Sequence, residues 1–285
     1  MKIRILAVLA LLASVAAFAD ETADGQKACE ELGWQLAVHA YTFRLFPISE
    51  AIQKTAGLGL KYMSLSGSVN LDGKKPVTTV NLSDEQLQTI LQECKAAGIT
   101  LVNIGVVTLP PDEAQSRKVF EFAKKAGIDT LVAEPEPAAL DVVEKLCKEY
   151  NIKVAIHDHP RPSHYWNPDT VLEALKGRTP LMGACADVGH WVRSGLNPVD
   201  CLKKLDGHII CLHFKDLNKY GPDAHDVPWG TGVSNVKGMM EELKRQNFHG
   251  AFCVEYEYHW DNSSPEIAQS VKFFNATCDE LVAEK

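Results

Sequence analysis

Short β-type segments alternate with longer segments of helical periodicity from Trp34 to the end of the sequence, and polar residues follow many of the β-type segments. These two observations predict a single (β/α)8 barrel, because strand-helix repeats build a parallel sheet and barrel active sites gather at the carboxyl ends of the strands. Eight such repeats fit in the 285 residues of the chain. An open, doubly wound sheet is the alternative, since periodicity alone does not prove closure.

The predicted strands are apolar or β-branched runs bounded by turn residues. In chain order they cover residues 35–41, 61–67, 100–107, 130–135, 153–159, 181–188, 209–216 and 251–257. The clearest intervening helices are expected at residues 83–98, 112–127, 138–151 and 235–247. Several of these begin at Ser, Asp or Asn and end at Gly or Asn, as helix caps do, and Ser83 with Gln86 has the spacing of a capping box.

The first residues have the pattern of a secretory signal. A basic start precedes an apolar stretch shorter than the ~20 residues of a spanning helix, and Ala17 and Ala19 supply the small residues of a cleavage site. We therefore expect residues 1–19 to be a signal peptide and residues 20–285 to form the barrel domain. The expected location is the periplasm or the medium, without membrane association after cleavage.

The mature chain is expected to be acidic. The formal net charge of −8 for the whole sequence becomes about −10 once Lys2 and Arg4 leave with the signal. There is no stripe of Lys and Arg, so neither nucleic acid nor anionic lipid is expected as a partner.

Eight cysteines in an exported protein raise the question of disulfides. Six of the cysteines fall on inward strand faces or in amphipathic helices, where Cys serves as a small apolar filler. Cys29 and Cys278 lie near the two ends of the mature chain, and first and last elements meet when a sheet closes. They form the plausible pair, and the sequence leaves open whether they bond.

Four predicted strands end at a metal-type ligand: Glu134, Asp187, His213 and Glu255. Side chains alternate between faces along a strand, so each polar group comes last on a face that is otherwise small or apolar. Three carboxylates and one imidazole suit Mn, Mg, Co or Zn. Each residue alone could be a capping or ion-paired group, but four in register predict one divalent metal ion.

Two histidines, His157 and His159, follow the fifth strand on one face. Either is a candidate metal ligand, and the other a general base, because imidazole titrates near neutrality. Whether Glu134 or one of these histidines is the first ligand stays open.

Further candidates follow the other strands. Lys215 shares a face with His213 and is placed to polarise a carbonyl or hold a hydroxyl, and Glu255 is also a candidate to move a proton. For aromatic residues in loops, simple packing is the competing explanation. The candidate substrate-binding residues are His39, Tyr41, His190, Arg193, Trp166 and Trp229.

The segments AYTFR, AIHDHPRP, ADVGHWVRSG, LHFKD, HDVPWGTG and VEYE together resemble the xylose isomerase-like TIM barrel superfamily, the sugar phosphate isomerase/epimerase group, over nearly the whole mature chain. The resemblance implies one divalent metal bound by Glu, Asp, His and Glu from strands five to eight. Asp187, His213 and Glu255 match the last three. His157 stands at the family's strand-five Glu position, and Glu134 comes one strand earlier. This departure favours Glu134 or a strand-five His as the remaining ligand, with another His removing the proton.

The resemblance implies a metal-dependent sugar isomerase or epimerase that works through an enediolate. Export argues against phosphorylated substrates, so the expected partner is a small unphosphorylated sugar or keto-sugar. The same intermediate would serve a 3-keto-glycoside lyase or hydrolase, or a dehydratase, and a non-catalytic sugar-binding barrel is the alternative of another class. A weaker likeness to type IV apurinic endonucleases conflicts with the acidic charge. The sugar, the metal and the oligomeric state stay open.

Overall fold

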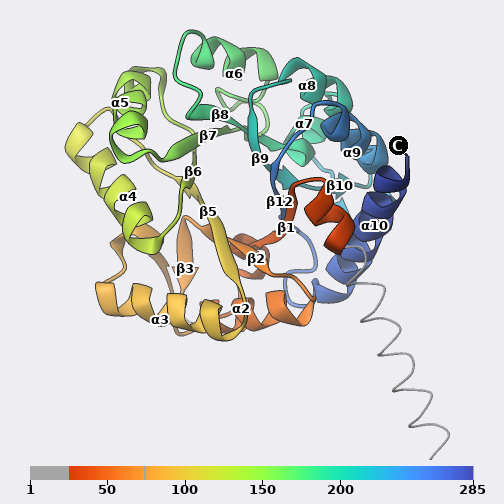
Figure 1. Cartoon of the computed structure of the whole chain (residues 1–285), viewed down its shortest axis with the longest axis horizontal. Helices are drawn as coiled ribbons and strands as arrows, with labels where there is room; N and C mark the ends of the chain where they lie inside the picture. The colour runs from red at the N-terminus through yellow and green to blue at the C-terminus, as the bar shows by residue number, and fades with distance from the viewer. Residues whose placement is uncertain (1–25, 74, 285) are drawn as a thin grey trace, which may run out of the picture.

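Eight parallel strands close into a barrel in the computed structural model, which describes residues 26–73 and 75–284 (Figure 1). Closure pairs the first strand with the last, in register from Trp34 opposite Gly250 to Val38 opposite Val254. The TIM barrel prediction is confirmed, and the open-sheet alternative is wrong. The order around the barrel is β1 (Trp34–His39), β12 (Gly250–Val254), β9 (Ile209–Phe214), β8 (Met182–Asp187), β7 (Lys153–His157), β6 (Thr130–Ala133), β5 (Thr100–Val107) and β2 (Tyr62–Ser66).

Helices surround this barrel on the outside (Figure 1). They are α2 (Ile48–Gly57), α3 (Asp84–Ala96), α4 (Glu113–Ala126), α5 (Leu140–Tyr150), α6 (Pro168–Leu175), α7 (Val188–Arg193), α8 (Pro198–Lys204), α9 (Val236–Arg245) and α10 (Ser264–Ala283). Among the described residues, three short 3-10 helices are η1 (Ala40–Phe43), η2 (Thr79–Asn81) and η3 (Pro137–Ala139). The capping box at the start of α3 is confirmed, because Ser83 Oγ accepts from Gln86 N at 3.2 Å and Gln86 Oε1 accepts from Ser83 N at 2.9 Å.

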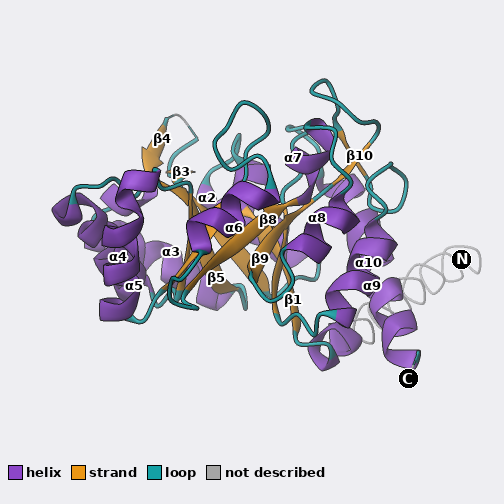
Figure 2. Cartoon of the chain, turned by 90° about the horizontal axis from the view of Figure 1, so that it is seen from above, coloured by secondary structure: helices purple, strands orange, loops and turns teal. Residues whose placement is uncertain are grey.

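The two ends of the barrel differ. Two small antiparallel sheets, β3 (Ser68–Asn70) with β4 (Pro76–Thr78) and β10 (Asp216–Leu217) with β11 (Asp226–Val227), follow the carboxyl ends of β2 and β9. Figure 2 shows both of them, with the long loops, at one end of the molecule. This is the end at which barrel active sites form.

The inside of the barrel is filled by small residues. This inner cluster consists of Ala37, Val132, Ala155, Cys185, Cys211, Ala251 and Cys253, all buried. Most of the larger buried apolar side chains belong to a second, more extensive core cluster. Because strand side chains alternate, the residue two positions after an inner one faces inward one layer higher. Three cysteines of this cluster therefore place Asp187, His213 and Glu255 directly above the apolar core.

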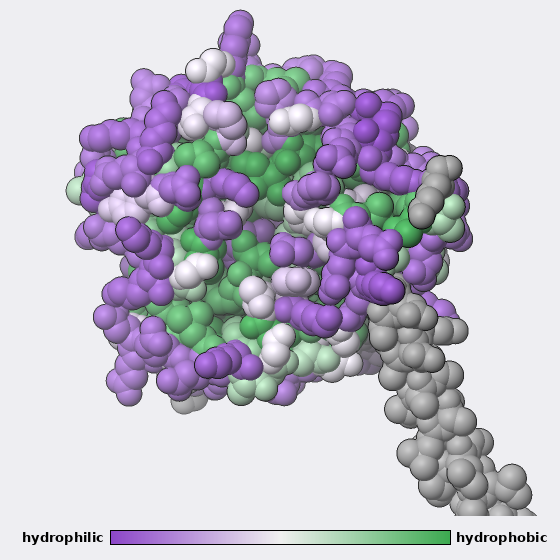
Figure 3. Space-filling view, in the orientation of Figure 1, coloured by the Kyte–Doolittle hydropathy of each residue, from purple (hydrophilic) through white to green (hydrophobic). Residues whose placement is uncertain are grey.

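One face of the molecule shows how polar and apolar side chains are distributed on the surface. On the face drawn in Figure 3, hydrophilic side chains dominate the periphery, and apolar side chains show between them toward the middle. None of the helices among residues 26–73 and 75–284 is both long and apolar enough to span a bilayer. The predicted signal peptide, residues 1–19, lies outside the described residues.

Candidate metal centre and its cavity

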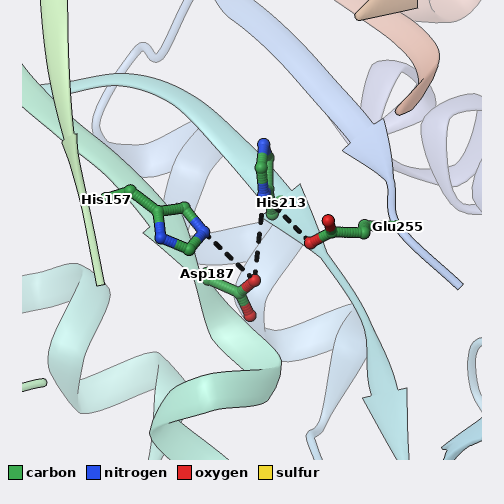
Figure 4. Close-up of side chains that lie close together, drawn as sticks. All are labelled: His157, Asp187, His213 and Glu255. Carbon is green, nitrogen blue, oxygen red and sulfur yellow. Dashed lines mark ion pairs between the residues drawn. The ribbon is translucent and has the colours of Figure 1, made fainter. Parts of the chain in front are cut away.

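Four buried side chains converge at the carboxyl ends of β7, β8, β9 and β12, which are neighbours in the barrel. They are His157, Asp187, His213 and Glu255, and each offers a ligand atom within 4.8 Å of the others (Figure 4). His157 Nε2 lies 3.5 Å from Asp187 Oδ2. His213 Nδ1 lies 3.0 Å from Glu255 Oε2 and 3.8 Å from Asp187 Oδ2. We refer to these residues as the four-ligand group.

The donor atoms of this group fit a divalent metal ion. His157 Nε2 and both ring nitrogens of His213 are buried and form no hydrogen bond of acceptable geometry, although His213 Nδ1 lies close to Glu255 Oε2. This is costly for polar atoms unless another ligand satisfies them. Burial lowers the pKa of His213 to about 4 despite the nearby Glu255, so its imidazole is neutral and has a lone pair to donate. Asp187 and Glu134 outweigh burial at His157 and raise its pKa to about 10, so a metal ion would displace a proton from His157 on binding. Two imidazoles and two carboxylates suit zinc, manganese or cobalt.

Both carboxylates of the group carry charge. Burial alone would raise the pKa of Asp187, but the positive charge of Lys215 outweighs it and holds this pKa well below its ordinary range. The same balance holds for Glu255, where the positive charge of Lys215 outweighs burial and holds the pKa well below its ordinary range. A metal ion would therefore meet two ionised carboxylates without first displacing protons from them.

Glu134 lies outside the four-ligand group, although it was a candidate ligand. Its Oε1 is 3.3 Å from His157 Nδ1 and 2.6 Å from His159 Nδ1, and it accepts from His159 N at 2.8 Å. Burial alone would raise the pKa of Glu134, but the hydrogen bonds from the two histidines hold it far below its ordinary range. The sequence left Glu134, His157 and His159 as alternatives for the remaining metal ligand. Of these three, the geometry favours His157.

A cavity of about 430 Å³ opens next to the four-ligand group, which is within the size range of small-ligand sites. Its lining includes both histidines of the fifth predicted strand, His157 and His159, and three of the predicted substrate-binding residues. The lining residues are His39, Tyr41, Ser66, Gly67, Ser68, Val106, His157, His159, His190, Glu255 and Glu257.

Three predicted substrate-binding residues are not part of this lining. The guanidinium of Arg193 donates hydrogen bonds to Glu257 Oε2 at 2.8 Å, to Asp226 Oδ2 at 3.0 Å and to His190 Nδ1 at 3.1 Å. The guanidinium of Arg161 lies over the ring of Trp166, with Arg161 Cζ 3.7 Å from the ring centroid. Trp229 is only 2% exposed and belongs to the main core.

Lys215 is fully buried, and its ammonium contacts the four-ligand group directly. Its Nζ lies 2.5 Å from Asp187 Oδ2 and 2.6 Å from Glu255 Oε2. Burial alone would lower the pKa of Lys215, but these two carboxylates raise it well above its ordinary value. The predicted candidate is therefore a charged partner of the ligands, and it is not in the lining of the cavity.

Sequence reasoning missed three acidic residues that shape the site. Glu257 lines the cavity, and its position two residues after Glu255 on the same face was the signal. Asp158 Oδ1 accepts from Asp187 N at 2.8 Å and fixes the end of β8. Asp216 accepts from the backbone of the 230–234 loop at three places. The last two act through backbone contacts, which leave no mark in a sequence pattern.

The chain belongs to the xylose isomerase-like TIM barrel family, whose model matches residues 11–277. A putative uncharacterized protein from Parabacteroides distasonis ATCC 8503 is 35% identical, with a TM-score of 0.68, over 86% of this chain and 99% of that one. No curated protein matches the chain.

Two more distant structures share the fold. A D-tagatose 3-epimerase-like protein is 18% identical, with a TM-score of 0.68, over 87% of this chain and 99% of that one. A xylose isomerase-like TIM barrel protein from Mycobacterium smegmatis, in complex with magnesium, is 14% identical with a TM-score of 0.68, over 87% of this chain and 97% of that one.

Proposed function

We propose that the protein is a divalent-metal-dependent isomerase or epimerase of a small unphosphorylated sugar or keto-sugar. One observation carries the proposal: the four-ligand group, with its unpartnered buried nitrogens, lies beside a cavity that an additional histidine, His159, also lines. A metal site next to a free base is what proton removal from the carbon beside a carbonyl requires.

The charge of the cavity supports an unphosphorylated substrate. Among the described residues that line it, none is Lys or Arg, whereas Glu255 and Glu257 are both present. A phosphate group would find no Lys or Arg side chain in this lining to bind it. The signal-type sequence at residues 1–19 supports action outside the cytoplasm, where sugar phosphates are not kept.

The roles of the side chains follow from their positions. His157, Asp187, His213 and Glu255 would hold the metal, which supplies Lewis-acid stabilisation of negative charge on sugar oxygens when bound. His159 would take the proton, because it is half-exposed to the cavity and is held by a carboxylate. Hydroxyl groups of the sugar would be oriented by His190 and by other polar lining residues.

Solvent proton exchange tests the proposal. The metal-loaded protein is incubated in D2O with aldoses, ketoses and keto-sugars, and deuterium at the carbon next to the carbonyl is followed by NMR. We expect His159→Gln to slow exchange by about 100-fold or more while the metal content stays unchanged. The matched control is His164→Gln, because His164 is an exposed histidine of the same loop that does not line the cavity.

The products distinguish the possible reactions. Reprotonation of the intermediate gives an isomer or epimer, whereas expulsion of a β-substituent would reveal a lyase or dehydratase with the same first step. Exchange in His159→Gln within twofold of the native rate would contradict the assigned base. No exchange with any sugar, despite bound metal, would favour a non-catalytic sugar-binding barrel.

A further inference from the structure

The carboxylate of Glu134 lies between two imidazoles that serve different parts of the site. Its Oε1 is 3.3 Å from His157 Nδ1 and 2.6 Å from His159 Nδ1, and it also accepts from His159 N at 2.8 Å. Its other oxygen accepts from Ser163 Oγ at 3.2 Å. One histidine is 2% exposed, and the other is 49% exposed. A single carboxylate therefore contacts both a buried histidine and one at the cavity.

The direction of these hydrogen bonds fixes the positions of two protons. An ionised carboxylate only accepts, so a ring nitrogen bonded to it must carry hydrogen. Glu134 Oε1 lies within hydrogen-bond distance of three nitrogens, the backbone N–H of His159 and Nδ1 of each imidazole, so it is placed as the acceptor toward both rings. In the neutral form of each imidazole, Nδ1 then bears the proton and Nε2 keeps its lone pair.

The lone pairs that result lie where two functions need them. His157 Nε2 is buried, has no hydrogen-bond partner and lies 3.5 Å from Asp187 Oδ2, inside the four-ligand group. His159 lines the cavity through its exposed ring. Metal-ligating histidines commonly donate their second N–H to a carboxylate, and general-base histidines are oriented in the same way.

We propose that Glu134 is a positioning residue that sets the tautomers of both histidines at once, so that His157 presents Nε2 to the metal and His159 presents Nε2 to the substrate. The half that concerns His159 rests on the proposed function. The half that concerns His157 requires only the metal site.

Direct ligation by Glu134 explains the contacts less well. Its Oε1 is already surrounded by three N–H groups and its Oε2 by a hydroxyl. In the described part of the chain, the unpartnered buried histidine nitrogens are those of His157 and His213, in the four-ligand group. A second ion held by Glu134, His157 and His159 would have to displace the protons that these contacts require, so a single ion is expected.

The test uses the whole mature chain, expected to be residues 20–285, loaded with zinc, because zinc is compatible with NMR. Long-range 1H–15N spectra of histidine rings report which nitrogen carries hydrogen, and calorimetry with zinc alone gives stoichiometry and affinity. The variants are Glu134→Ala and its matched control Glu136→Ala, an exposed glutamate two residues further along the same loop. Neither measurement needs a substrate, so a failed activity screen leaves this test intact.

In the native protein and in Glu136→Ala we expect one zinc ion, with His157 and His159 both protonated at Nδ1. In Glu134→Ala we expect zinc affinity to fall by about 10- to 100-fold and His159 to populate the Nε2–H tautomer. Unchanged affinity with unchanged tautomers in Glu134→Ala would overturn the proposal. Two zinc ions in the native protein and one in the variant would also overturn it, because Glu134 would then be a ligand.

A second variant keeps the test decisive if Glu134→Ala does not fold. Glu134→Gln retains an acceptor oxygen that is weaker than a carboxylate, so zinc affinity should fall by less than in the alanine variant but measurably. Native affinity and native 15N signals in Glu134→Gln would contradict a role for the carboxylate charge.

Discussion

Lys215 places a positive charge against the residues that would bind the metal. Its Nζ contacts Asp187 Oδ2 and Glu255 Oε2, the same oxygens that lie near the ring nitrogens of His157 and His213. A side chain on Gly189 would begin 2.7 Å from Lys215 Cδ, so a glycine is required beside the lysine. The ammonium therefore neutralises part of the negative charge that attracts a divalent ion.

Removal of this charge should strengthen metal binding. For Lys215→Met, which keeps most of the buried volume, we expect zinc or manganese affinity to rise on the order of tenfold, because one positive charge leaves the neighbourhood of the ion. Calorimetry measures the affinity, and Lys219→Met, at an exposed lysine in the loop that follows, is the matched control. Weaker binding in Lys215→Met would show that the lysine holds the ligands in place instead.

Strand-end patterns singled out three of the four residues that converge in the structure, because Asp187, His213 and Glu255 each end an inward face of small residues. The role of Glu134 was not predictable in this way. Its strand, β6, ends at Ala133, so Glu134 lies just beyond the sheet and reaches the next strand's histidines. Trp229 was a candidate substrate-binding residue in the sequence, but it is buried in the core, which is decided by tertiary packing.

At the scale of elements, the eight strands were predictable because each has a local signal, a short apolar run closed by turn residues. The positions of the strands in the structure agree with the predicted ranges to within a few residues. Short elements without such a signal were missed. The sheets β3–β4 and β10–β11 contain strands of only two or three residues, and their pairing depends on loop geometry.

Two elements at opposite ends of the chain meet through cysteines. Cys29, in the helical segment at 26–31, and Cys278, in α10, are both buried, with their Sγ atoms 2.7 Å apart. Both are thiols in the structure, so the bond stays a prediction. In an oxidising compartment, exchange with a disulfide oxidoreductase would oxidise both thiols and join α10 to the segment that precedes β1.

We expect the native protein to show two fewer reactive thiols after unfolding without reductant than the eight cysteines of the sequence. Loss of the bond should cost ~2–4 kcal/mol of stability. Reductant should therefore lower the thermal midpoint of the native protein and leave that of a Cys29→Ala/Cys278→Ala double variant unchanged. Eight reactive thiols in protein purified from the periplasm or the medium would contradict this pairing.

At the scale of the whole molecule, closure of the barrel is what creates the site. The cavity takes residues from the ends of β1, β2, β5, β7 and β12 and from α7, which are far apart in the sequence. The repeat count predicted closure, and closure predicted that strand-end residues would meet. The particular cavity depends on loop conformations and on which side chains fill the space between them, so its lining emerged only from the structure.

Metal content of the mature protein tests the central claim most directly. Elemental analysis should find about one equivalent of a divalent metal after reconstitution, and the Asp187→Ala/His213→Ala double variant should bind none. The matched control is Asp223→Ala/His225→Ala, which removes the same residue types from a loop outside the four-ligand group. No metal in the native protein, or equal metal in the Asp187→Ala/His213→Ala variant, would contradict the account.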